Sequence, residues 1–135
     1  MTATEPLIRV SDLAVHFPLK GPLLGPRPVL KAVDGVSLDI PRGSFFGLVG
    51  ESGSGKTTLG RAILKAAPIS EGSVRYADGE KGFDVGAMPK AETREFRRRA
   101  QLIFQDPYAA LSPRMTVRDI IAEPLEVMEL TASRE

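Results

Sequence analysis

Residues 50–57, GESGSGKT, combine glycines, a lysine and hydroxyl side chains at the spacing of a phosphate-binding loop, G-x-x-x-x-G-K-[ST]. Glycine lets the backbone turn tightly and approach an anion without a Cβ in the way. Successive backbone N–H groups then point at the anion, at the positive end of the helix that follows. The segment therefore predicts that the chain binds a nucleoside triphosphate.

Two side chains of this loop have separate expected roles. Lys56 supplies a positive charge toward the β- and γ-phosphates, and Thr57 offers a hydroxyl to Mg²⁺, which prefers oxygen ligands. The alternative is a glycine-rich turn that matches the pattern by chance. The flanking sequence favours the phosphate loop, because the apolar run SFFGLVG (44–50) predicts a buried strand before it and KTTLGRAILKAA predicts a helix after it.

Strands and a helix must position this loop. Period-two alternation predicts a strand over residues 7–17 and another over 29–40, with Asp34-Gly35 as a turn or bulge in the second. Between them, the proline- and glycine-rich segment PLKGPLLGPRP (18–28) predicts an irregular loop. A tight turn is expected at 41–43. In the helix after the loop, Leu59, Ile63 and Ala66 share one face, and Pro68 is expected to stop it.

The C-terminal half predicts shorter elements. Residues 72–85 resemble a hairpin with an Asp78-Gly79 turn, residues 89–100 a basic helix, and QLIF (101–104) a second short buried strand. Thr116 and Asp119 have the spacing of a helix-capping box, and Pro124 is expected to interrupt or restart the helix that follows. TASRE (131–135) has the pattern of a further helix cap.

Composition and charge limit the kinds of site, location and partner that the chain can have. The chain has 135 residues, a net charge of +1 and no cysteine, so disulfides and thiolate metal sites are excluded. Neither a signal peptide nor an apolar stretch of about 20 residues is evident, which predicts a cytosolic chain. The arginines at 97–99 could suggest nucleic acid, but the balanced charge favours a solvated helix face and no nucleic-acid partner.

The stretch VDGVSLDIPRGSFFGLVGESGSGKTTLGRAIL resembles the nucleotide-binding domain of ABC (ATP-binding cassette) ATPases, and RRRAQLIFQDPYAALSPRMTVRDIIAEPL resembles the glutamine loop of their oligopeptide and dipeptide importers. The resemblance implies an α/β P-loop NTPase fold, here incomplete. It would comprise an antiparallel β subdomain, part of the RecA-like core and the start of the helical subdomain. The expected segments are strands leading to the loop (7–49), the loop and its helix (50–67), a hairpin, helix and strand (68–104), and the glutamine loop with the helical start (105–135).

The resemblance also assigns roles to residues. The phosphates of ATP would be surrounded by Gly53, Gly55, Lys56, Thr57 and Thr58, with Ser52 lining the loop. Gln105 would reach Mg²⁺ or the attacking water and sense the membrane subunit. Phe17 falls where the family has an aromatic that stacks on adenine, the alternative being a core aromatic. Its neighbour His16 is expected on the opposite strand face, as an ordinary strand residue. Tyr108 would contact the membrane subunit or be an ordinary loop aromatic.

Several motifs of the family are not found in these residues: the LSGGQ signature, the strand ending in Asp-Glu and the switch histidine. No catalytic residue is therefore assigned, and the chain is expected to be the N-terminal portion of a longer protein. That protein is expected to be the ATPase subunit of a peptide importer at the inner face of the cell membrane. It would bind permease subunits and a second ATP-binding subunit. The alternatives are a hydrolytically inactive nucleotide-binding module and a non-transport ABC ATPase.

Overall fold

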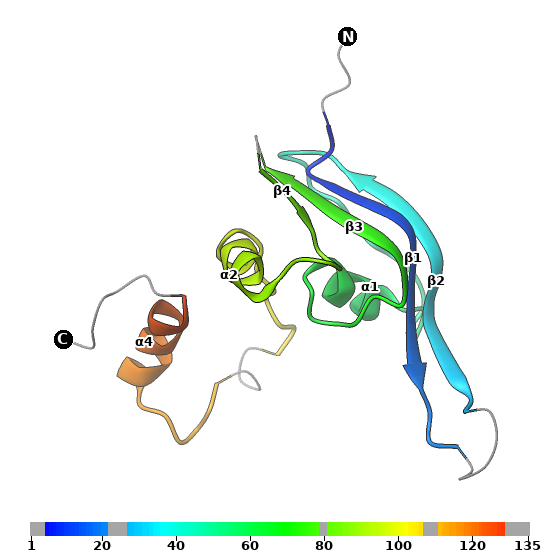
Figure 1. Ribbon diagram of the computed structural model, residues 1–135. Helices are drawn as coiled ribbons and strands as arrows, with labels where there is room; N and C mark the ends of the chain where they lie inside the picture. Colours follow the sequence, from blue (N-terminus) through cyan, green and yellow to red (C-terminus); the bar gives the residue numbers. More distant parts are fainter. Residues whose placement is uncertain (1–4, 22–26, 79–80, 107–110, 129–135) are drawn as a thin grey trace. The chain divides into compact units, whose positions relative to one another are not determined.

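The computed structural model describes residues 5–21, 27–78, 81–106 and 111–128 (Figure 1). It divides into two compact units, residues 1–93 and 94–135, with the boundary inside one helix. The first unit contains the strands β1 (Ile8–Pro18), β2 (Val29–Ile40), β3 (Glu71–Asp78) and β4 (Lys81–Asp84), and the helix α1 (Lys56–Ile63). The helix α2 (Lys90–Arg99) crosses the boundary, and α4 (Val117–Val127) belongs to the second unit.

All four strands form one antiparallel sheet in the order β2-β1-β3-β4. The predicted strands at 7–17 and 29–40 and the hairpin at 72–85 are thus confirmed to within a few residues. The expected turn at 41–43 is also present. The first unit therefore contains the antiparallel β subdomain of the expected fold.

The long β1–β2 pair is irregular because its strands contain extra residues. Asp12 of β1 has a left-handed φ of 47°, and Gly35 of β2 has a φ of 69°, each at a register shift between the two strands. The Ser37 hydroxyl accepts the Asp12 N–H at 2.8 Å and donates to the Asp12 carboxylate at 3.1 Å, so the first bulge is held by its neighbour. The bulge predicted at Asp34-Gly35 is therefore present.

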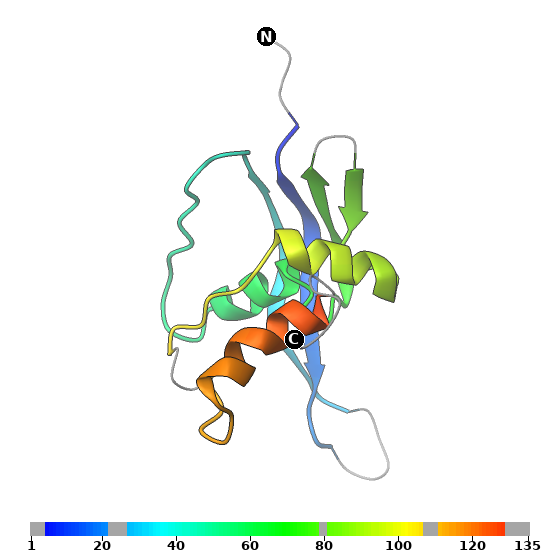
Figure 2. The same cartoon turned by 90° about the vertical axis from the view of Figure 1, so that its left-hand side faces the viewer.

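One face of this sheet packs against α1 (Figures 1 and 2). The helix contributes Leu59 and Ala62, spaced three residues apart so that both side chains meet the sheet. The core of this unit consists of aliphatic and aromatic side chains: Val10, Leu13, Ala14, Val15, Val33, Leu59, Ala62, Val74, Tyr76, Phe83, Val85 and Met88. The helix ends at Ile63, before Pro68, because Lys65 takes a left-handed φ of 54°. Ala66 is consequently exposed and not on the packed face.

Two predicted strands are wrong. Residues 44–50 and 101–104 have no strand conformation, and their side chains are exposed, Phe45, Val49 and Ile103 almost completely. A continuous apolar run indicates that a segment is suited to burial, but a strand also needs hydrogen-bonded neighbours. The sheet of the described residues offers neither segment such a neighbour.

In the second unit, α4 begins as predicted. The Thr116 hydroxyl accepts the backbone N–H of Asp119 at 3.2 Å, and no side chain of the helix is buried within the described structure. Pro124 lies inside α4 without interrupting it, contrary to the prediction. Two C-terminal arginines of α2 bond within the second unit: Arg98 donates to the carbonyl of Met128, and Arg99 pairs with Glu95 at 3.0 Å.

Some predictions fall on residues that are not described: Gly79 of the hairpin turn, Tyr108, and the cap at 131–135. Over the ranges that are described, no helix is long and apolar enough to cross a membrane.

Candidate phosphate-binding site

The glycine loop has the backbone conformation that its sequence predicts. Gly53 and Gly55 have φ angles of 81° and 91°, in the left-handed region that favours glycine. At Gly55 a side chain is also excluded by space, because a Cβ there would lie 2.2 Å from the carbonyl oxygen of Ala32 in β2. The loop is therefore seated directly on the β1–β2 pair.

The start of α1 faces into this loop. Gly55 is the N-cap and has no side chain to accept a hydrogen bond, and the first helical bond runs from the Leu59 N–H to the Gly55 carbonyl at 2.8 Å. The N–H groups of the first turn before Leu59 have no acceptor within the helix. Together with the helix dipole, they favour an anion at this end of α1.

Lys56 curls back over the loop. Its Nζ donates to the carbonyls of Gly50 and Glu51 at 2.8 and 2.5 Å, and lies 3.3 Å from the Ser54 hydroxyl. The ammonium group is thus held by the carbonyls of the loop itself, in the pocket that the start of α1 also lines. A phosphate at this position would meet one full positive charge and several amide donors.

A pocket of about 530 Å³ opens between the loop and the end of the β1–β2 pair. It brings together most of the predicted site residues, and its lining consists of Phe17, Leu30, Lys31, Ala32, Gly53, Ser54, Gly55, Lys56, Thr57 and Thr58. Phe17 is thus in the same pocket as the glycine loop, although the two are far apart in the sequence. An aromatic ring at one end and anion donors at the other suit a ligand with a planar base and phosphates.

Two predicted residues are not part of this pocket. Ser52 is exposed in the loop and does not line it. Gln105 lies in a bend of the second unit, after the exposed segment 101–104. Their expected roles stay predictions.

Three lining residues on β2 were not predicted. Leu30 pairs directly with Phe17 across the strands, and Lys31 pairs with His16. Ala32 is an extra residue in β2, since Val33 pairs with Val15 on its other side. Alternation in the sequence could place Leu30 on the face of Phe17 only if the strand register were known. The bulge at Ala32 leaves no signal in the sequence.

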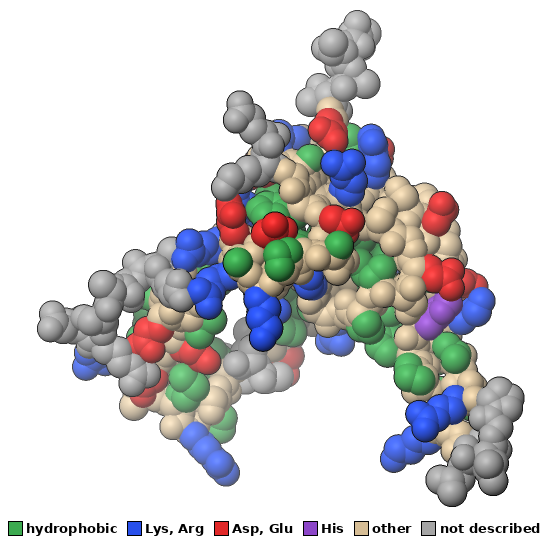
Figure 3. All heavy atoms as spheres, in the orientation of Figure 1, with side chains coloured by type: hydrophobic (Ala, Val, Ile, Leu, Met, Phe, Trp, Pro, Cys, Tyr) green, Lys and Arg blue, Asp and Glu red, His purple; other side chains and the backbone are tan. Residues whose placement is uncertain are grey.

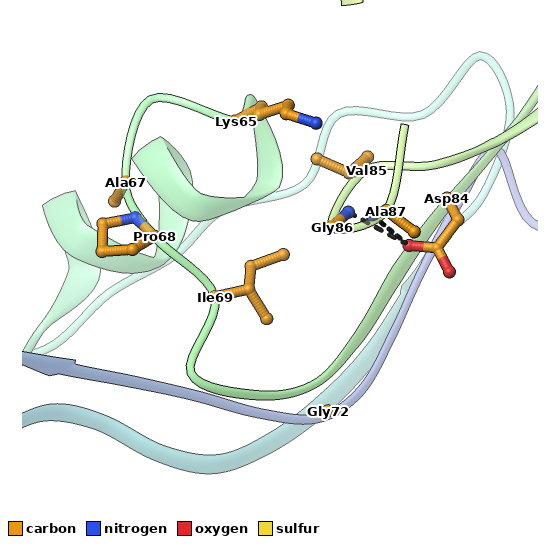
Figure 4. A pocket seen from close by; sticks show the side chains of 9 residues that line it. All are labelled: Lys65, Ala67, Pro68, Ile69, Gly72, Asp84, Val85, Gly86 and Ala87. Atoms are coloured by element: carbon orange, nitrogen blue, oxygen red, sulfur yellow. Dashed lines mark hydrogen bonds between the residues drawn. The ribbon is translucent and has the colours of Figure 1, made fainter. Parts of the chain in front are cut away.

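A second pocket of about 430 Å³ lies where the chain leaves α1 and where β4 leads to α2 (Figure 4). The Asp84 carboxylate accepts the N–H groups of Gly86 and Ala87 at 3.0 and 3.3 Å, and Lys65 donates to the Met88 carbonyl at 2.7 Å. Both charged groups of this pocket are thus already engaged by the protein. An anion there would also meet the Asp84 carboxylate, and the pocket lies at the C-terminal end of α1, so it is the weaker candidate for a phosphate.

Comparisons with known proteins show what this chain is similar to. The chain is similar to the putative oligopeptide transport ATP-binding protein YkfD of Bacillus subtilis, at 49% identity over 93% of this chain and 35% of that protein. It is also 44% identical to the oligopeptide transport ATP-binding protein OppF of the same organism, over 98% of this chain and 40% of OppF. The chain thus spans little more than a third of the length of these curated relatives.

A solved structure shares the fold. The dimeric, post-hydrolysis ATP-binding cassette MJ0796, bound to ADP and Pi, matches with a TM-score of 0.69 at 23% identity, over 93% of this chain and 50% of that one. The family model described as ABC transporter matches residues 33–134. The resemblance to ABC ATPases and to their peptide-transport subgroup is therefore confirmed, and the chain belongs to the ABC transporter family.

Proposed function

We propose that this chain binds ATP in the pocket between Phe17 and the glycine loop, as part of the ATP-binding subunit of a peptide importer. The observation that carries the proposal is the presence of Phe17 and residues 53–58 in one pocket. Phe17 would stack on adenine, and Lys56 with the N–H groups of α1 would bind the phosphates. The relatives named as oligopeptide transport proteins support the choice of substrate class.

Mg²⁺ fits the residues present. Thr57 brings a hydroxyl to the pocket, and Gln105 is the second expected oxygen ligand. Among the described residues there is no group of three or more His, Cys, Asp or Glu that could hold a metal ion. Mg²⁺ commonly binds through few protein ligands and keeps phosphate oxygens and waters, so the Thr57 hydroxyl would suit it once phosphates are bound. The ion would neutralise phosphate charge beside Lys56.

The whole protein would act at a membrane. We propose that it binds permease subunits through the glutamine-loop region and a second ATP-binding subunit, at the cytoplasmic face. ATP binding and hydrolysis would then be coupled to import of peptides. Recovery of permease subunits with the full-length protein from detergent-solubilised membranes would test this, and recovery with DNA-repair or other soluble partners alone would contradict it.

Replacing Phe17 with alanine should weaken ATP binding about tenfold, because stacking of a base on an aromatic ring is lost. Phe17→Tyr should bind like the unsubstituted chain, since the ring face remains. Titration of a fluorescent ATP analogue in the presence of Mg²⁺ measures both. Phe45→Ala is the matched control, because Phe45 is fully exposed and does not line the pocket. Equal affinity of Phe17→Ala and Phe45→Ala would exclude the stacking role.

A further inference from the structure

Three charged or titratable side chains meet on β1 and β2 beside the pocket. Asp34 is within 3.2 Å of Lys31 Nζ and 3.5 Å of His16 Nε2. His16 is the only histidine of the chain, and Figure 3 shows it beside acidic and basic side chains at the surface. Its Nε2 is buried and has no hydrogen-bond partner in the described part of the chain, so the contact with Asp34 is a proximity of charged or titratable groups. The hydrogen bond from Lys31, with a contribution from His16, lowers the pKa of Asp34, so its carboxylate is charged at neutral pH.

This cluster exists because of the bulge at Ala32. Along a regular strand, residues three apart such as Lys31 and Asp34 point to opposite faces. The extra residue between the pairs His16↔Lys31 and Val15↔Val33 reverses the alternation, so that Lys31 and Asp34 share a face. Val15 and Val33 point into the core. Asp34 therefore accepts a hydrogen bond from Lys31 across the bulge on its own strand, and it lies 3.5 Å from His16 on the partner strand.

The bulge is also the point where the strands touch the glycine loop. The Ala32 carbonyl lies so close to Gly55 that a Cβ there would be 2.2 Å from it. On the other side of the cluster, Phe17 follows His16 in β1 and Leu30 precedes Lys31 in β2. Phe17 and Leu30 pair across the strands, and both line the pocket. The His16 N–H donates to the Ser70 hydroxyl at 2.9 Å, which ties β1 to the segment after α1. A change in the bulge would thus alter the position of Phe17 relative to the loop.

Resting on the proposed function, we propose that Asp34 is a positioning residue for the nucleotide. By holding Lys31 and His16 across the Ala32 bulge, it fixes the distance between the base-binding end of the pocket, at Phe17, and the phosphate-binding loop. The ion pair is exposed, with side chains of Asp34 and Lys31 more than half accessible, so it adds little to the stability of the fold. Loss of the ion pair should therefore change the geometry of the pocket without a general loss of structure.

The experiment compares two probes on the same chain: ATP, which needs both ends of the pocket, and inorganic tripolyphosphate, which needs only the loop. Asp34→Asn should reduce ATP affinity about fivefold, because part of the affinity that comes from stacking of the base is lost. It should leave tripolyphosphate affinity unchanged. Competition against a fluorescent ATP analogue measures both affinities at fixed ionic strength.

Asp39→Asn is the matched control. Asp39 lies on the same strand and forms a similarly exposed ion pair with Arg9 at 3.2 Å, but neither Asp39 nor Arg9 lines the pocket. It should leave the ratio of ATP to tripolyphosphate affinity unchanged. If Asp34→Asn keeps that ratio, whether both affinities persist or fall together, the positioning role is wrong. Binding of neither probe by the unsubstituted chain would instead refute the proposed function, and this inference with it.

Discussion

Replacing Lys56 with alanine should reduce the affinity of the chain for ATP about thirtyfold or more, the largest functional effect of any single side chain here. Lys56 is the only side chain of the glycine loop with a full positive charge, and it lines the pocket as the first residue of α1. Its loss removes charge-assisted hydrogen bonds to phosphate, which are about twice as strong as neutral ones.

The substitution also removes an internal support of the loop. Nζ now donates to the carbonyls of Gly50 and Glu51, so the loop without it is less ordered before any ligand arrives. Both effects act in the same direction on affinity. The sheet is not involved, because Lys56 does not belong to the core, and the unfolding midpoint in urea should hardly change.

Titration with a fluorescent ATP analogue and with tripolyphosphate measures the effect. Lys90→Ala is the control, since it removes the same charge from an exposed position outside the pocket. At fixed ionic strength, Lys90→Ala should bind as tightly as the unsubstituted chain. A Lys56→Ala chain that binds within about threefold of this control would show that the loop is not the phosphate site.

The features that were predicted correctly from the sequence are those that nearby residues determine. Alternation predicted β1 and β2, and the glycines with Lys56 predicted the loop, because turn conformations and phosphate contacts depend on nearby residues. Segments 44–50 and 101–104 were predicted wrongly as strands, since their apolar side chains indicate burial without saying which strand would pair with them. Burial and pairing depend on distant parts of a chain.

The same distinction applies to the site. Phe17 was predicted from its place in a family pattern, and the fold brings it to the loop. Leu30, Lys31 and Ala32 complete the pocket through the register of β1 with β2, which includes an unpredicted extra residue. A bulge is a property of two strands together, so inspection of either strand alone does not reveal it. The cluster around Asp34 was missed for this reason.

Replacing Gly72 with alanine should have the largest effect on stability, lowering the free energy of unfolding by about 3 kcal/mol. Gly72 has a left-handed φ of 77° at the start of β3. A Cβ there would lie 2.3 and 2.4 Å from the carbonyl oxygens of Asp12 and Ser11 in β1. These atoms are backbone and belong to a bulge that is itself strained, with Asp12 at a φ of 47°, so they cannot move aside without breaking strand pairing.

The matched control is Gly82→Ala in β4 of the same sheet. Its added Cβ would meet nothing closer than the Tyr76 carbonyl at 3.8 Å, which is ordinary contact. Alanine there also restricts the unfolded chain, so stability should stay within about 1 kcal/mol of the unsubstituted protein. Urea unfolding followed by circular dichroism compares the two variants. Because β1 lies between β2 and β3, loss of its pairing with β3 would separate the edge hairpin from the strands that carry the pocket. If both variants unfold at the same urea concentration, the close packing of Gly72 on the β1 bulge does not determine the stability of this sheet.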